Sequence, residues 1–182
     1  MSDIAPSNFS LSSRTGGVRI ERVALGAMVR VTLAPGRRDI EAGLEAAFAA
    51  SWPASPNHVM AADPAIYWFG PGDWLVQTAT TRSEVVAARL SDLIPADGGS
   101  AVAVGDGHVG YDIGGRDAAA LLASACPLDL DRFASGRSAR TLFAGANVLL
   151  HRRDDEAFRL LSDRTLGAFL QDFFAAALRE FS

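Results

Sequence analysis

Lysine is absent from the sequence, and all 17 basic residues are arginine. The chain therefore cannot form a lysine Schiff base, place a P-loop lysine on a phosphate, or use a lysine as general base. Its single cysteine, Cys126, excludes an internal disulfide and is typical of a reducing compartment. No apolar run reaches the ~18 residues of a membrane span, and the first residues lack the pattern of a secretory signal. We therefore expect a cytoplasmic protein.

Positive charge is the minority charge. The 17 basic residues stand against 21 acidic ones, which gives a formal net charge of -4 at pH 7. The arginines are scattered between Arg14 and Arg179, whereas binding to nucleic acid requires a concentrated basic face. We expect no nucleic-acid partner and no membrane partner. With 182 residues, 49% of them apolar, the chain can bury a core without the help of a metal or a disulfide.

Cofactor and catalytic motifs are also missing. Residues 105–110, Gly-Asp-Gly-His-Val-Gly, match the letters of a dinucleotide-binding loop, but strand residues follow where that loop needs a helix. We predict instead that Asp106 and Gly107 form a tight hairpin turn between two strands. The three histidines are widely spaced, and Cys126 has no recognisable base beside it in the sequence. We expect no catalytic, cofactor-binding or metal-binding residues in this chain.

Hydrophobic periodicity predicts both strands and helices. Segments that alternate with a period of two indicate strands, and apolar residues three and four apart indicate helices. The order strand, strand, helix, strands, helix occurs in residues 17–95 and again in residues 96–182. We predict an α+β fold of two similar halves in one compact unit, each half an antiparallel sheet with helices packed on one face. Residues 1–16 are rich in small polar side chains and are expected to form a mobile arm.

The best-patterned helix is the one that closes the chain. Apolar side chains recur at helical spacing from Leu166 to Phe181, with polar residues opposite them. Phe169 and Phe173 belong to this stripe, so we expect both rings in the core. Truncating either ring to Ala would then cost about 3–5 kcal/mol of stability.

An unusual concentration of aromatic residues lies between residues 67 and 75. Trp68 and Trp74 flank the turn Gly70-Pro71-Gly72, with Asp73 next to the second ring. The rings either fill the core or lie at the rim of an interface, where aromatic anchors are favoured. We predict that one tryptophan lies in the core and that the other, with Asp73 beside it, is available to a partner.

This segment and a later one resemble the gamma subunit of heterotetrameric sarcosine oxidase. Phe69–Leu75, Phe-Gly-Pro-Gly-Asp-Trp-Leu, is similar to the family's Leu-Gly-Pro-Asp-Glu-Trp-Leu turn. Pro127-Leu-Asp-Leu130, Phe133, Gly136 and Arg140-Thr141 are similar to a second family pattern. The two segments supply the candidate subunit-interface residues Trp68, Phe69, Pro71, Asp73, Trp74, Asp129 and Phe133.

The resemblance carries expectations about the whole complex. It implies a fold similar to the folate-binding part of aminomethyltransferases, and alpha, beta and delta subunits as partners. It implies that this complex oxidatively demethylates sarcosine to glycine with tetrahydrofolate and O2. FAD, FMN, NAD, tetrahydrofolate and zinc are implied for the other subunits, and no cofactor is implied for this chain. The chain would then be a subunit of an oxidoreductase and would have no catalytic residues itself. The alternative is a stand-alone folate-binding one-carbon protein that resembles aminomethyltransferases.

Overall fold

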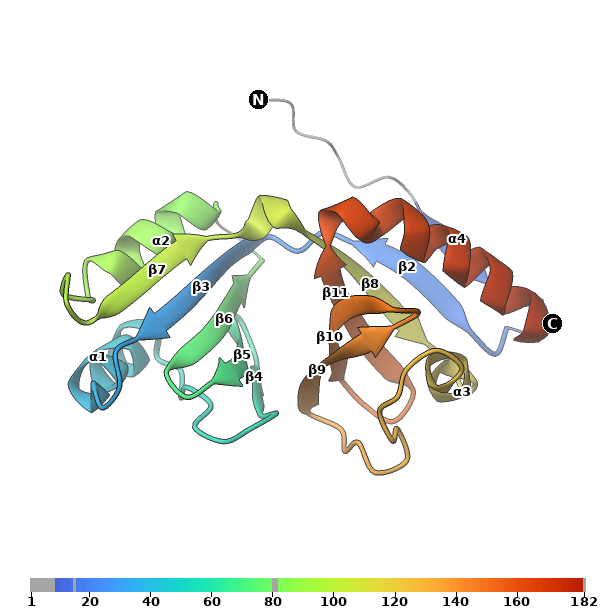
Figure 1. The fold of residues 1–182 in the computed structure, drawn as a ribbon, viewed down its shortest axis with the longest axis horizontal. Coiled ribbons are helices and arrows are strands. Elements are labelled where there is room, and N and C mark those ends of the chain that lie inside the picture. Colours follow the sequence, from blue (N-terminus) through green and yellow to red (C-terminus); the bar gives the residue numbers. More distant parts are fainter. Residues whose placement is uncertain (1–8, 15, 80–81, 182) are drawn as a thin grey trace. The chain divides into compact units, whose positions relative to one another are not determined.

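The computed structural model describes residues 9–14, 16–79 and 82–181. Its contacts divide the chain into two units. The middle unit runs from Leu25 to Asp106, and the terminal unit combines the described residues up to Ala24 with those from Gly107 onward. Each unit has one antiparallel sheet and two α-helices (Figure 1). The predicted α+β fold of two similar halves is confirmed.

The middle unit contains a five-stranded sheet in the order β4-β5-β6-β3-β7. The strands are β3 (Ala27–Leu33), β4 (Val59–Ala61), β5 (Ala65–Gly70), β6 (Asp73–Thr78) and β7 (Gly99–Ala103), and the helices are α1 (Arg38–Phe48) and α2 (Ser83–Ser91). Alternate residues of β3, Val29 and Val31, pack in one core with Leu44 of α1 and Leu90 of α2. Both helices therefore cover the same face of the sheet.

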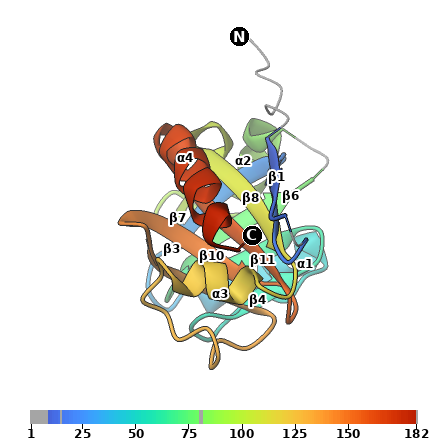
Figure 2. The ribbon, with the colours of Figure 1, turned by 90° about the vertical axis from the view of Figure 1, so that its right-hand side faces the viewer.

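The terminal unit contains a six-stranded sheet in the order β1-β2-β8-β11-β10-β9. The strands are β1 (Ser10–Ser12), β2 (Arg19–Val23), β8 (His108–Gly114), β9 (Arg137–Phe143), β10 (Ala146–Arg152) and β11 (Ala157–Asp163), and the helices are α3 (Ala118–Ala123) and α4 (Gly167–Ala177). Figure 2 looks onto the face of this sheet that α3 and α4 cover. No helix formed by the described residues is long and apolar enough to cross a lipid bilayer.

Tyr111 joins the closing helix to the terminal sheet. Its side chain is fully buried, its hydroxyl donates a hydrogen bond to the Gly167 carbonyl at 2.9 Å, and its ring packs edge-on against Phe174 at 5.2 Å. Burial raises the pKa of the Tyr111 phenol, so the hydroxyl stays protonated and can donate. The contact orients the first turn of α4 toward the core.

The prediction for the closing helix was wrong for Phe169. This side chain is 47% exposed, whereas Leu170 and Phe174 are fully buried. Phe173 is half-buried and packs edge-on against Phe143 at 5.2 Å. Leu170 and Phe174 are four residues apart and share a face of the helix, and Phe169 lies well around the helix from them. The apolar stripe is wider than the core contact, so periodicity alone did not select the buried edge.

The predicted hairpin at Asp106 and Gly107 was also wrong. A short 3₁₀ turn, Gly105–Gly107, separates β7 from β8, and these two strands belong to different sheets. β7 pairs with β3, while β8 pairs with β2 and β11. The residues after Gly107 form a strand, so the helix that a dinucleotide-binding loop needs does not follow this segment.

The unit boundaries differ from the predicted division at residues 95 and 96. β2 pairs with β8 of the terminal unit, and β7 pairs with β3 of the middle unit. Each sheet therefore includes a strand from the other half of the sequence. Part of the expected mobile arm is structured as well, because residues 10–12 form β1 and pair with β2. Residues 1–8 and 15 of that arm lie outside the described residues.

Candidate functional site

The two tryptophans of the β5–β6 turn lie on the same face of their hairpin. Trp68 and Trp74 are directly opposite each other in the antiparallel register. Trp74 is only 3% exposed, whereas Trp68 is half-buried at the edge of the same core. The structure thus gives the two rings the different burial that we expected, although cross-strand pairing, and not alternation, orients them.

Trp74 is held from two sides. Its Nε1–H donates a hydrogen bond to the Pro53 carbonyl at 2.8 Å, and its ring packs edge-on against Trp52 at 5.2 Å. The Trp52 backbone N–H in turn donates to Glu45 Oε1 at 2.7 Å. These contacts connect the turn to α1 and to the segment after it, so Trp74 serves the core of the middle unit.

Asp73 and Phe69 lie on the opposite face of the sheet from the tryptophans. Asp73 accepts two hydrogen bonds from the Arg30 guanidinium, at 2.6 and 2.5 Å, and this guanidinium lies 4.7 Å from the centre of the Phe69 ring. The expectation that Asp73 lies beside the exposed tryptophan was wrong, because side chains alternate along β5 and β6. Asp73 instead fixes the hairpin to β3.

A groove of about 670 Å³ runs beside Trp68, and we call it the tryptophan groove. Trp68 and Trp74 line it together with one face of α1, and the backbone of Gly36 and Gly72 borders it. The α1 face consists of residues three, four and seven positions apart, as a helix requires: Arg38, Glu41, Ala42 and Glu45. Pro71, another candidate interface residue, is exposed at the groove.

Both signs of charge border the tryptophan groove. Arg37 donates to Asp39 at 3.0 and 3.1 Å and lies 3.8 Å from Asp97. The Arg37 hydrogen bond holds the pKa of Asp39 below its usual value, so this carboxylate stays ionised. Aromatic side chains are enriched in protein–protein interfaces, whose rims are polar.

Asp129 and Phe133 do not belong to the unit that carries the tryptophan groove. Phe133 is buried in the core of the terminal unit, and its carbonyl accepts a hydrogen bond from Arg152 at 2.8 Å. Asp129 is exposed and accepts a hydrogen bond from the Arg132 backbone N–H at 3.3 Å. The structure therefore gives Phe133 a packing role, and only Asp129 of this pair is accessible.

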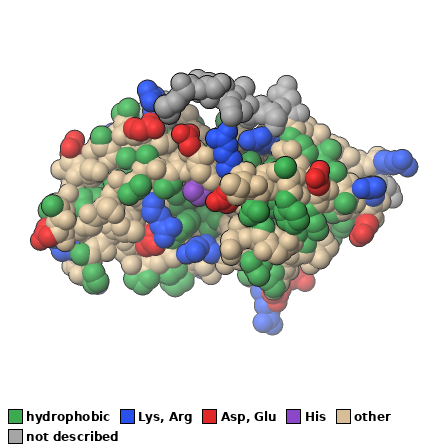
Figure 3. Space-filling view, turned by 45° about the horizontal axis from the view of Figure 1, so that its top comes forward, with side chains coloured by type: hydrophobic (Ala, Val, Ile, Leu, Met, Phe, Trp, Pro, Cys, Tyr) green, Lys and Arg blue, Asp and Glu red, His purple; other side chains and the backbone are tan. Residues whose placement is uncertain are grey.

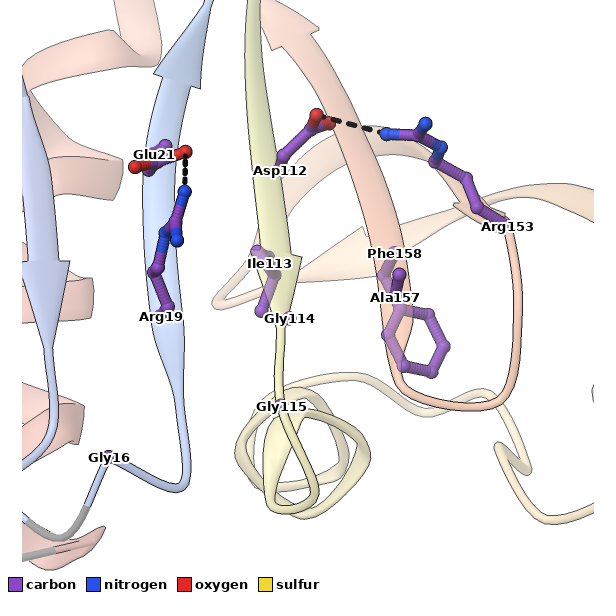
Figure 4. Close-up of a pocket in the computed structure, with 10 residues that line it drawn as sticks. All are labelled: Gly16, Arg19, Glu21, Asp112, Ile113, Gly114, Gly115, Arg153, Ala157 and Phe158. Atoms are coloured by element: carbon purple, nitrogen blue, oxygen red, sulfur yellow. Dashed lines mark hydrogen bonds and ion pairs between the residues drawn. The ribbon is translucent and has the colours of Figure 1, made fainter.

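A second cavity, of about 430 Å³, lies in the terminal unit, and we call it the charged hollow (Figure 4). Glu21, Asp112 and Arg159 form one row across β2, β8 and β11. The row on the same face two residues along consists of Arg19, Gly114 and Ala157. Gly114 has no side chain and Ala157 has a small one, which leaves the hollow beside Arg19. Sequence reasoning missed this site because its residues meet only through strand pairing.

Ion pairs organise the charged hollow. Arg159 donates to both oxygens of Asp112, at 2.7 and 2.8 Å, and Arg153 donates to Oδ2 of the same carboxylate at 3.0 Å. Arg19 donates to Glu21 at 2.8 Å, as Figure 4 shows, and this contact raises the pKa of Arg19. Arg19 is therefore charged at neutral pH.

The residues that could carry metal or acid–base chemistry are dispersed. Among residues 9–14, 16–79 and 82–181, no group of three His, Cys, Asp or Glu side chains could hold a metal ion. Cys126 is buried, with its sulfur 3.8 Å from Thr141 Oγ1. Burial, followed by Arg153 and Arg159, lowers the pKa of His151 to about 4, so this imidazole is neutral at pH 7. On the face drawn in Figure 3, basic and acidic side chains of the described residues are interspersed.

Comparison with known proteins identifies structural relatives. No protein-family model and no curated protein matches the sequence. The chain is similar to a chain of heterotetrameric sarcosine oxidase from Corynebacterium sp. U-96 in complex with pyrrole 2-carboxylate, with 25% identity and a TM-score of 0.82, over 91% of this chain and 85% of that one. It is also similar to glycine cleavage system aminomethyltransferase T from Bartonella henselae, with 13% identity and a TM-score of 0.59, over 87% of this chain and 44% of that one. The predicted resemblance to sarcosine oxidase and to the aminomethyltransferase fold is confirmed.

Proposed function

We propose that this chain is the non-catalytic gamma subunit of a cytoplasmic heterotetrameric sarcosine oxidase. The observation that carries the proposal is the similarity to a chain of that enzyme over 91% of this chain and 85% of the other. The match thus pairs two chains of similar length. By contrast, the chain spans only 44% of the aminomethyltransferase, with 13% identity, which supports a common fold alone.

A supporting role agrees with the chemistry of the described residues. The tryptophan groove has rings and charges suited to contact but no nucleophile beside a base, and Cys126 is buried in the other unit. In this proposal the alpha, beta and delta subunits hold FAD, FMN, NAD, tetrahydrofolate and zinc and demethylate sarcosine. This chain stabilises them, with Trp68 and Pro71 at the contact.

Co-expression with the alpha, beta and delta chains of the same organism tests this function. We expect one stable complex on size-exclusion chromatography at micromolar concentration, with an interface above roughly 1,000 Å², the scale of a specific contact. The purified chain alone should be colourless and should produce no hydrogen peroxide from sarcosine. Separate elution of this chain, or sarcosine-dependent peroxide from the chain alone, would contradict the proposal.

The aminomethyltransferase fold supports a second candidate, a stand-alone folate-binding protein. A fluorescence titration of the isolated chain with tetrahydrofolate separates the two functions. Saturable binding together with failure to join the complex would favour the second candidate. Absence of binding together with complex formation would favour the first.

A further inference from the structure

The four edge strands of the two sheets differ in how well they are protected. An edge strand presents unpaired N–H and C=O groups, and proteins usually protect such an edge by keeping the strand very short or by charged side chains. β1 and β4 have three residues each, and β9 carries Arg137 and Arg140. β7 is the exception, because its five residues, Gly-Ser-Ala-Val-Ala, include no charge and no proline.

The pairing of β7 with β3 determines which of its backbone groups are already used. Opposite residues of an antiparallel pair alternately exchange hydrogen bonds and face away from each other. The Val104 N–H, just after β7, donates to the Met28 carbonyl at 2.9 Å. Val102 and Ser100 lie two and four residues before Val104, so they also bond to β3.

Ala101 and Ala103 alternate with these residues, so their N–H and C=O groups point away from β3. Within the described part of the chain, no hydrogen bond occupies these groups. The side chains of both alanines pack against the core, while Val102 on the other face is 53% exposed. Figure 1 shows β7 as the outermost strand of its sheet. The edge therefore offers two donors and two acceptors to a further strand.

Residues that line the tryptophan groove contact the start of β7. Leu33 lines the groove and is paired with Gly99, and Arg37 lines it and lies 3.8 Å from Asp97. Only β3 separates β7 from β6, which carries Trp74, so β6 and β7 are about 10 Å apart, or two strand spacings. Three or four extended residues span this distance. One partner segment can therefore contact both the groove and the edge.

We infer that an extended segment of a partner subunit adds to β7 as a sixth strand of the middle sheet. Its backbone would bond to Ala101 and Ala103, as a peptide does when it extends an exposed sheet edge. Since β7 has no charge to pair with, main-chain hydrogen bonds and apolar contact with Val102 would hold the segment, which we expect to be uncharged. The inference rests on the proposed subunit function and specifies how this chain attaches to its partners.

Amide hydrogen exchange tests the inference residue by residue. In the isolated full chain, measured by NMR, the Ala101 and Ala103 amides should exchange fast and the Ser100 and Val102 amides slowly. On assembly with the alpha, beta and delta subunits, exchange at Ala101 and Ala103 should slow about tenfold or more, because these amides become hydrogen-bonded. Mass spectrometry with residue-level fragmentation measures the complex.

Ala101→Pro should block the edge without breaking the pairing with β3, because the N–H that it removes points outward. The variant should stay folded and bind the partner subunits about tenfold or more weakly, because a hydrogen bond is lost. Ala101→Gly is the matched control, since it keeps the N–H at the same position, and it should bind as the wild type does. Urea unfolding checks that both variants fold. If Ala101→Pro does not fold, amide exchange in the wild type decides.

Three results would overturn the inference and leave the proposed function intact: a complex in which Ala101 still exchanges fast, equal affinity of Ala101→Pro and the wild type, or equal losses in the two variants. Failure to assemble would contradict the inference and the proposed function together. Protection of Ala101 that rises with the concentration of the isolated chain would assign the edge to a second copy. Protection of Ala101 in the dilute isolated chain would mean that the edge is already covered. Either result would overturn the inference.

Discussion

The tryptophan groove and the charged hollow are built in opposite ways. Large rings, those of Trp68 and Trp74, line the groove, whereas the hollow lies where Gly114 has no side chain. The groove uses one continuous part of the sequence, and the hollow joins β2 to β8 and β11. Removing a side chain should therefore damage the groove, and adding one should close the hollow.

The largest effect is expected for Trp74→Ala. The ring is 3% exposed, packs edge-on against Trp52 and donates a hydrogen bond to the Pro53 carbonyl. Its loss should cost about 3–5 kcal/mol in a urea titration, the usual cost of truncating a buried aromatic ring. Phe169→Ala, which shortens an exposed ring, is the control and should cost less than ~1 kcal/mol. A loss below ~1 kcal/mol for Trp74→Ala would mean that the groove does not depend on its buried ring.

Trp68→Ala should separate docking from folding. The ring is only half-buried, so the variant should unfold at a denaturant concentration closer to the wild type than Trp74→Ala does. If the groove docks a partner subunit, affinity for the complex should fall by about 2 kcal/mol, the scale of an interface hot spot. Phe169→Ala again serves as control. Unchanged affinity with an intact fold would remove Trp68 from the interface.

The two neighbouring glycines should respond differently to alanine. Gly114→Ala should change stability by less than ~1 kcal/mol, because the added Cβ fits and the unfolded chain loses freedom. Gly115→Ala should destabilise by more than ~1 kcal/mol, because its positive φ and the close Gly17 carbonyl exclude a side chain. Thermal unfolding of both variants measures the contrast. Equal losses would show that the hollow is as tightly constrained as the turn.

The smallest effect is expected at His151, which reports on the charges of the hollow. Its pKa is lowered from 6.5 to about 4, mainly by burial, then by Arg153 and Arg159, while Asp112 acts in the opposite direction. Because the folded pKa lies below the unfolded one, the stability that His151 contributes is present above pH 6.5 and is lost as the pH falls toward 4. Arg153→Gln should raise this pKa, as an NMR titration of the imidazole would show. An unchanged pKa would mean that Arg153 does not influence His151.

Local patterns predicted much of the fold but few of its pairings. The helical spacing between Leu166 and Phe181 predicted the closing helix, observed as α4, because burial of one face repeats within a short stretch. The Asp106-Gly107 dipeptide suggested a hairpin between β7 and β8. Each of these strands instead pairs with a strand far away in the chain, β7 with β3 and β8 with β2. A turn signal contains no information about such partners.

The candidate functional sites were likewise only partly predictable from the sequence. The aromatic cluster around Pro71 was recognisable in the sequence, because all its members lie within nine residues. The opposite placement of Asp73 follows from its register beside Trp74, which requires the hairpin geometry. The charged hollow requires Arg19, Gly114 and Ala157 to stand side by side across three strands, and no local pattern contains that row.

The exchange of β2 into the terminal sheet has a consequence for the order of folding during synthesis. β2 leaves the ribosome before Leu25–Asp106, but β8, the later strand with which it pairs, emerges only after the whole of that segment. The middle unit is continuous, so its contacts can form while the chain is still growing. One edge of β2 stays unpaired until β8 has been synthesised. Pairing β2 with β8 closes a long loop, and contacts between residues so far apart in the sequence form slowly. The helix α4 then completes a unit whose first strands precede Leu25–Asp106 in the chain.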